Sequence, residues 1–130
     1  MRVGLLIITH DGIGPSVLGT ATLMLNACPL PVKLLSVSHD SDPEDLADHA
    51  KALITELNEG DGVLILTDVI GATPGNVARQ LLGQADVCLV GGLNLPMLMR
   101  VLNYPDLAIG ELAQKAVSGG KEGVIRAEKT

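Results

Sequence analysis

The sequence has almost no aromatic residues: Trp and Phe are absent, and Tyr104 is the single aromatic side chain. Aliphatic side chains must therefore fill the core. Proteins that bind single-stranded nucleic acid usually stack bases on aromatic rings, so this composition argues against that function. Basic residues are also few, with nine Lys and Arg against fifteen Asp and Glu, which gives a formal net charge of −6. This charge makes nucleic acids and anionic membranes unfavourable partners.

Cysteine and long hydrophobic runs are equally scarce. Cys28 and Cys88 are far apart and lie in apolar stretches, so we expect two buried thiols, not a metal or redox site. No apolar run approaches the roughly 18 residues that a membrane span needs. The N-terminal Met1-Arg2-Val3 leads straight into a strand-like segment, with no signal peptide. We therefore expect a cytoplasmic protein with no segment inserted in a membrane.

The remaining composition is typical of one globular domain. The chain has 130 residues, of which 47% are hydrophobic, enough for a single core. No linker, repeat or low-complexity tract interrupts the sequence, so we expect residues 1–130 to form one domain.

Apolar runs of strand length alternate with amphipathic stretches of helix length, as in a parallel α/β sheet. Helices are predicted to begin near Pro15, Asp42, Thr73 and Asn94, and a last one follows Asp106 and ends near Gly119-Gly120. Right-handed crossovers then give a doubly wound sheet of four parallel strands in the order 2-1-3-4, with helices on both faces. The predicted strands are 3–8, 32–38, 63–67 and 87–90, and an isolated strand is expected at 122–128.

Such sheets bind ligands beyond the carboxyl ends of the strands, where the strand order reverses. That point lies between the first and third strands, which are followed by His10 and Asp68. A glycine-bearing turn and a helix follow each, so two helix N-termini aim backbone N–H groups at one crevice. This combination favours phosphoryl transfer through histidine. The imidazole is the nucleophile, and the carboxylate holds the proton of the other ring nitrogen and so fixes its tautomer and basicity.

Other polar residues near these turns have simpler interpretations. Asp68 itself could merely cap its turn. Thr73 is expected to be a helix N-cap, although its hydroxyl could equally reach a phosphoryl group. His39 follows an edge strand among acidic residues, which indicates a solvated loop or at best a rim contact. His49 is predicted to lie on the exposed face of a helix.

Competing motifs are incomplete. Gly12-Ile13-Gly14 lacks the third glycine of a dinucleotide fingerprint, and there is neither a Walker-type G-K-[ST] nor a G-x-S-x-G elbow. Receiver domains carry a phosphoacceptor Asp after the third strand, but they need an acidic cluster after the first strand to hold Mg²⁺. A histidine there does not suit that hard cation. We therefore expect no metal and no cofactor.

Four segments together resemble the enzyme IIA domain of the mannose class of the bacterial phosphoenolpyruvate-dependent phosphotransferase system. They are residues 8–10, 66–76, 91–98 and 120–124. The second segment stands where the family usually reads D-x-x-G-G-S-P-x-N. Thr73 occupies the serine position and keeps the hydroxyl, whereas Ala72 replaces the second glycine and Gly75 replaces a commonly bulky residue.

The resemblance implies that His10 accepts a phosphoryl group from HPr and passes it to enzyme IIB, with Asp68 as its orienting partner. Gly12, Gly71, Ala72 and Thr73 would surround the phosphoryl group. The chain is expected to be a free-standing IIA domain without a IIB domain, and the sugar is chosen by the membrane component. Two alternatives remain: a regulatory phosphoprotein sensed by a partner, and the phosphoryl donor of dihydroxyacetone kinases, which the G-A-T-P-G-N stretch resembles less.

Dimers of this family exchange a C-terminal strand, which would give segment 122–128 a place. As an antiparallel strand from a twofold-related neighbour, it would cover the unpaired N–H and C=O groups of an edge strand. It would also bury Val124 and Ile125. We therefore expect a homodimer.

Overall fold

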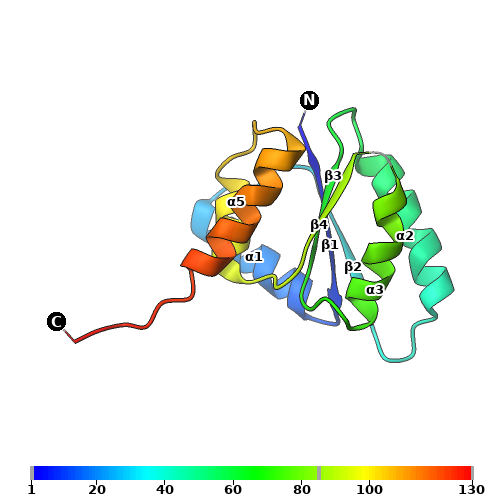
Figure 1. The fold of residues 1–130 in the computed structure, drawn as a ribbon, viewed down its shortest axis with the longest axis horizontal. Coiled ribbons are helices and arrows are strands. Elements are labelled where there is room, and N and C mark those ends of the chain that lie inside the picture. The colour runs from blue at the N-terminus through cyan, green and yellow to red at the C-terminus, as the bar shows by residue number, and fades with distance from the viewer. Residues whose placement is uncertain (1, 85, 130) are drawn as a thin grey trace.

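The computed structural model describes residues 2–84 and 86–129. Within them, four parallel strands form one sheet in the order β2-β1-β3-β4 (Figure 1), which confirms the predicted doubly wound fold. The strands are β1 Gly4–His10, β2 Val32–Val37, β3 Val63–Thr67 and β4 Val87–Val90. The helices are α1 Ile13–Leu25, α2 Pro43–Leu57, α3 Thr73–Arg79, the 3₁₀ helix η1 Gln80–Gly83, α4 Leu95–Leu102 and α5 Ile109–Glu122.

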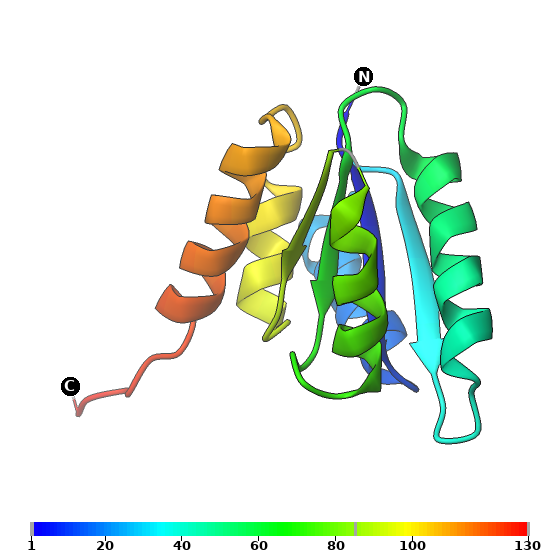
Figure 2. The same ribbon diagram turned by 45° about the vertical axis from the view of Figure 1, so that its right-hand side comes forward.

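The central strand β1 is buried on both faces, which explains why its sequence is almost continuously apolar. Leu6 and Ile8 pack in one core cluster with residues of α2 and α3. Leu5 and Ile7 pack in the second cluster with residues of α1, α4 and α5. Figure 2 shows these two helical layers on opposite sides of the sheet.

Helix α5 extends slightly beyond the predicted end, through both glycines to Glu122. Here the glycines serve close packing. A Cβ on Gly119 would lie 2.7 Å from Cβ of Arg100, and one on Gly120 would lie 2.9 Å from Cε of Met97. The Asn94 side chain also donates from Nδ2 to the Gly120 carbonyl at 3.1 Å. The last turn of α5 is thereby fastened to the start of α4.

The strand expected at 122–128 is not formed within this chain. Residues 124–129 have no regular secondary structure and project from the end of α5 (Figures 1 and 2), with Val124 and Ile125 78% and 77% exposed. Exchange of this segment with a second copy stays a prediction.

The expectation of two buried thiols is also wrong: Cys28 is exposed and Cys88 is half-buried. Cys28 lies in the connection from α1 to β2, where Leu30 fills the core in its place. No helix among residues 2–84 and 86–129 is both long and apolar enough to cross a membrane.

Candidate active site

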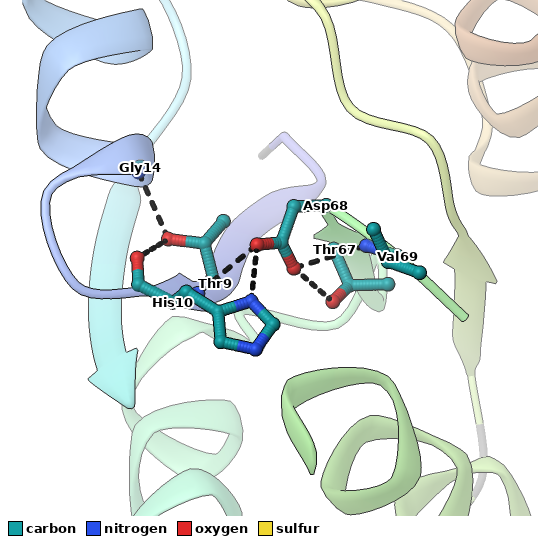
Figure 3. Close-up of polar contacts among 6 residues, drawn as sticks. All are labelled: Thr9, His10, Gly14, Thr67, Asp68 and Val69. Atoms are coloured by element: carbon teal, nitrogen blue, oxygen red, sulfur yellow. Dashed lines mark hydrogen bonds and ion pairs between the residues drawn. The ribbon is translucent and has the colours of Figure 1, made fainter. Parts of the chain in front are cut away.

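His10 and Asp68 meet at the carboxyl end of the sheet. His10 is the last residue of β1, and Asp68 directly follows β3, its parallel neighbour. Nδ1 of the His10 ring lies 2.7 Å from Oδ2 of Asp68 (Figure 3), and the backbone N–H of His10 donates to the same oxygen at 3.1 Å. The histidine side chain is 47% exposed and the aspartate side chain only 8%. The strand was predicted to stop at residue 8, but pairing with β2 extends it to His10.

Asp68 is held as an ionised acceptor. Burial raises its pKa, but the hydrogen bonds from the His10 ring, from the backbone N–H groups of His10 and Val69, and the charge of His10 outweigh burial and leave the pKa below its usual value. An ionised carboxylate only accepts hydrogen bonds, so Nδ1 of His10 must donate. The lone pair of the neutral ring is then on Nε2, at the ring edge away from Asp68 (Figure 3).

Two buried threonines precede this pair in the chain. Thr9 and Thr67 are 1% and 0% exposed. The Thr9 hydroxyl donates to the His10 carbonyl at 2.8 Å and accepts from the Gly14 backbone N–H at 2.9 Å. Thr9 thus ties the end of β1 to the first turn of α1.

The β4–α4 loop supports the turn after β3 from the other side. The backbone N–H of Gly92 donates to the Asp68 carbonyl at 3.1 Å, and that of Leu93 donates to the Thr67 carbonyl at 3.0 Å. These two bonds join the loop after β4 to the turn that carries Asp68.

A hollow of about 430 Å³ opens beside His10. Its walls come from His10, from Thr73 at the start of α3, and from the loop between β2 and α2. The lining residues that the structure describes include no lysine or arginine. An anion bound there would therefore depend on hydroxyl, imidazole and backbone N–H donors.

The predicted phosphoryl-binding residues are placed unequally around this hollow. Thr73 lines it, but Thr73 is not the helix N-cap as predicted: Ala72 is the cap, and Thr73 is the first helical residue. Gly71 lies in the turn before α3 with φ of 101°, and Gly12 caps α1 with φ of 85°, both left-handed conformations that favour glycine. Gly12, Gly71 and Ala72 do not line the hollow.

The N-termini of α1 and α3 also differ in their free backbone N–H groups and in their position relative to the hollow. In the first turn of α1, the Gly14 N–H already donates to Thr9, and Pro15 has no N–H. The His10 ring extends away from Gly14 (Figure 3), and Thr73 of α3 shares the hollow with it. The start of α3 is therefore the better placed of the two.

The other histidines behave as expected. The His39 side chain is 93% exposed, pairs with Asp40 at 3.1 Å and reaches the rim of the hollow. His49 is exposed on α2. Among the described residues, no three His, Cys, Asp or Glu side chains are grouped so that they could hold a metal ion.

Sequence reasoning missed Ser38 and Ser41, which line the hollow beside His10. The predicted strand order already indicated that these two residues lie near His10. Strand two lies next to strand one in the order 2-1-3-4, and the register pairs His10 with Val37. The residues that follow Val37 must therefore adjoin His10.

Together, the fold and this site define a class of protein: a doubly wound α/β domain that presents an exposed histidine held by a buried aspartate. The sequence comparison specifies the family. The model of the EIIA-man family, described as "PTS system fructose IIA component", matches residues 4–117, and the chain belongs to this family.

Curated relatives agree with this assignment. The chain is 30% identical over 127 residues to the PTS system mannose-specific EIIAB component of Escherichia coli K12. The match covers 95% of this chain and 39% of the relative, so the chain spans about two fifths of that protein's length.

Solved structures share the fold over nearly the whole chain. The mannose/sorbose specific IIA subunit of Enterococcus faecalis has a TM-score of 0.88 at 23% identity, covering 100% of this chain and 98% of its own. The PTS IIA protein associated with the fucose utilization operon of Streptococcus pneumoniae has a TM-score of 0.81 at 24% identity, covering 97% and 93%.

Proposed function

We propose that this chain is a cytoplasmic phosphocarrier of the phosphotransferase system that accepts a phosphoryl group from phospho-HPr on His10 and passes it to enzyme IIB. The observation that carries the proposal is the 2.7 Å contact between Nδ1 of His10 and Oδ2 of Asp68. It commits the Nδ1 proton to the carboxylate and leaves Nε2 as an exposed nucleophile. Membership of the EIIA-man family supports the same role.

One bond forms and one bond breaks in each transfer. The Nε2 lone pair attacks the phosphorus of the donor, the P–Nε2 bond forms, and the bond between phosphorus and the donor breaks with its electron pair returning to the donor. The ring gains positive charge while its Nδ1 proton stays in place, and the ionised Asp68 stabilises that charge. Transfer to IIB reverses these events with a new acceptor.

The phosphoryl oxygens would be held by neutral donors. Thr73 supplies a hydroxyl from the wall of the hollow. Gly12, Gly71 and Ala72 would contribute through the backbone of the two turns that precede α1 and α3. Preorganised donors of this kind stabilise charge that develops on oxygen during transfer, without a metal ion.

The test is incubation with phosphoenolpyruvate, enzyme I and HPr, followed by mapping of the phosphorylated residue. We expect one acid-labile, base-stable phosphoryl group on wild type and none on His10→Ala. His49→Ala is the matched control, since it removes an exposed histidine that lies outside the hollow, and it should label fully. Persistent label on His10→Ala would overturn the assignment. Strong suppression by EDTA of transfer from purified phospho-HPr would contradict transfer without a metal.

A further inference from the structure

A tight turn formed by Ser38, His39, Asp40 and Ser41 makes one wall of the hollow beside His10. Three contacts between its two serines close the turn. The Ser38 backbone N–H donates to Ser41 Oγ at 3.1 Å, the two Oγ atoms lie 3.1 Å apart, and the Ser41 backbone N–H donates to the Ser38 carbonyl at 3.2 Å. Both serines are half-buried.

The turn is also anchored at both ends. Before it, the Asp11 backbone N–H donates to the Val37 carbonyl at 3.0 Å, which joins this loop to the turn after His10. After it, the Asp42 side chain accepts from the Glu44 backbone N–H at 2.9 Å and caps α2. The serine hydroxyls are therefore held in position before any ligand arrives.

One hydroxyl proton of the pair is always left over. Each serine has a single hydroxyl proton, and only one of the two can lie between the Oγ atoms. Whichever serine donates that proton, its partner's proton has no acceptor among the hydrogen bonds of residues 2–84 and 86–129. The pair thus presents one uncommitted donor in a wall that it shares with His10.

We propose that the Ser38–Ser41 pair donates this hydrogen bond to an oxygen of the phosphoryl group as it transfers to His10, a role that rests on the proposed function. The hollow has no lysine or arginine in its described lining, and the side-chain donors of that lining besides the histidine rings are the hydroxyls of Ser38, Ser41 and Thr73. The serines form no covalent bond and exchange no proton with the substrate. Thr73 donates from α3, and the serine pair donates from the loop after β2.

Because only one hydroxyl proton of the pair is free, the single and the double serine variants should differ in transfer rate. In Ser38→Ala, Ser41 Oγ still accepts from the residue 38 backbone N–H and its own proton becomes free, so the donor survives. In Ser38→Ala/Ser41→Ala both hydroxyls are gone. We expect the maximal rate of transfer in the single variant to stay within about threefold of the wild-type rate. In the double variant we expect the maximal rate to fall about tenfold to a hundredfold. This loss is no larger than the loss of rate seen when one preorganised donor is removed from an oxyanion site.

The experiment is rapid-quench measurement of transfer from phospho-HPr at varied concentration, with Ser38→Ala/Ser41→Thr as the rescue variant and Thr55→Ala as the control. Thr55 is an exposed hydroxyl of α2 that bonds the Lys51 carbonyl. Loss of a donor to the phosphoryl group should lower the maximal rate and leave the half-saturating concentration of phospho-HPr unchanged. The ³¹P resonance of the phosphoprotein should also shift in the Ala/Ala variant and return in the Ala/Thr variant.

The results of this experiment distinguish failure of the serine donor from failure of the phosphocarrier role. If wild type labels on His10 and the Ala/Ala variant transfers at the wild-type rate, the serine donor is refuted and the phosphocarrier role stands. A raised half-saturating concentration with an unchanged maximal rate would make the turn a partner contact and likewise refute the donor. Failure of wild type to label at all would overturn both proposals.

Discussion

One carboxylate oxygen of Asp68 holds His10 at two points: Oδ2 accepts from the backbone N–H at 3.1 Å and lies 2.7 Å from Nδ1 of the ring. The other oxygen, Oδ1, accepts from the Val69 backbone N–H at 3.0 Å. The Asp68 carboxylate therefore fixes the His10 ring relative to the His10 backbone, and this one side chain holds the nucleophile in place.

Replacing Asp68 by asparagine should slow phosphorylation without moving it from His10. The neutral amide removes the charge that stabilises the phosphorylated ring, and the loss can reach about 10⁴-fold, the value for an orienting aspartate in a catalytic triad. Single-turnover transfer from phospho-HPr measures it. Asp61→Asn, at the opposite end of β3, is the matched control and should keep the wild-type rate. An undiminished rate for Asp68→Asn would reduce Asp68 to a turn residue.

The lowered pKa of Asp68 predicts a pH dependence of stability. Because the folded pKa lies below the usual carboxyl value of about 3.9, the unfolded chain takes up this proton more readily. The contribution to stability is full above that value and is lost as the pH falls through the folded pKa. The free energy of unfolding of wild type should therefore exceed that of Asp68→Asn at pH 5 by more than at pH 2. A constant difference over this range would contradict the lowered pKa.

Gly75→Ala should disturb the turn that carries Asp68. A Cβ at this position would lie 2.5 Å from the Val69 carbonyl oxygen and 3.0 Å from Cα of Ile70, both backbone atoms. The turn must shift to relieve this contact, at a cost of about 1–3 kcal/mol. Thermal unfolding and the transfer rate should both fall below wild type. Gly83→Ala is the control, since a Cβ there meets no atom within 4 Å.

We predict that the chain forms a dimer by exchange of residues 124–130, so that removing them leaves an unstable or aggregating monomer. The edge strand β4 and helix α5 border an apolar hollow of about 620 Å³, lined in part by Val87, Leu89 and Val117. A strand from a second copy that carries Val124 and Ile125 would fill this hollow with apolar side chains. Sedimentation of the truncated chain measures the result. An intact and equally stable dimer would show that the segment is only a tail.

The sheet order and the meeting of His10 with Asp68 could be predicted from sequence, because apolar strand runs and right-handed crossovers leave few arrangements. The end of α5 could not, since Gly119 reads as a helix stop until its contact with Arg100 is known. The hydrogen bond between Ser38 and Ser41 could not be predicted either, because it depends on the shape of one turn. Such details depend on packing between segments that are distant in the sequence or on exact loop geometry.

Whether Nε2 of His10 accepts the phosphoryl group can be measured by ³¹P–¹⁵N correlation NMR of the phosphorylated protein with labelled histidine rings. The geometry predicts one phosphohistidine, at Nε2 of His10, that is absent from His10→Ala. A phosphoryl group on Nδ1 of His10, or on His39 or His49, would contradict it.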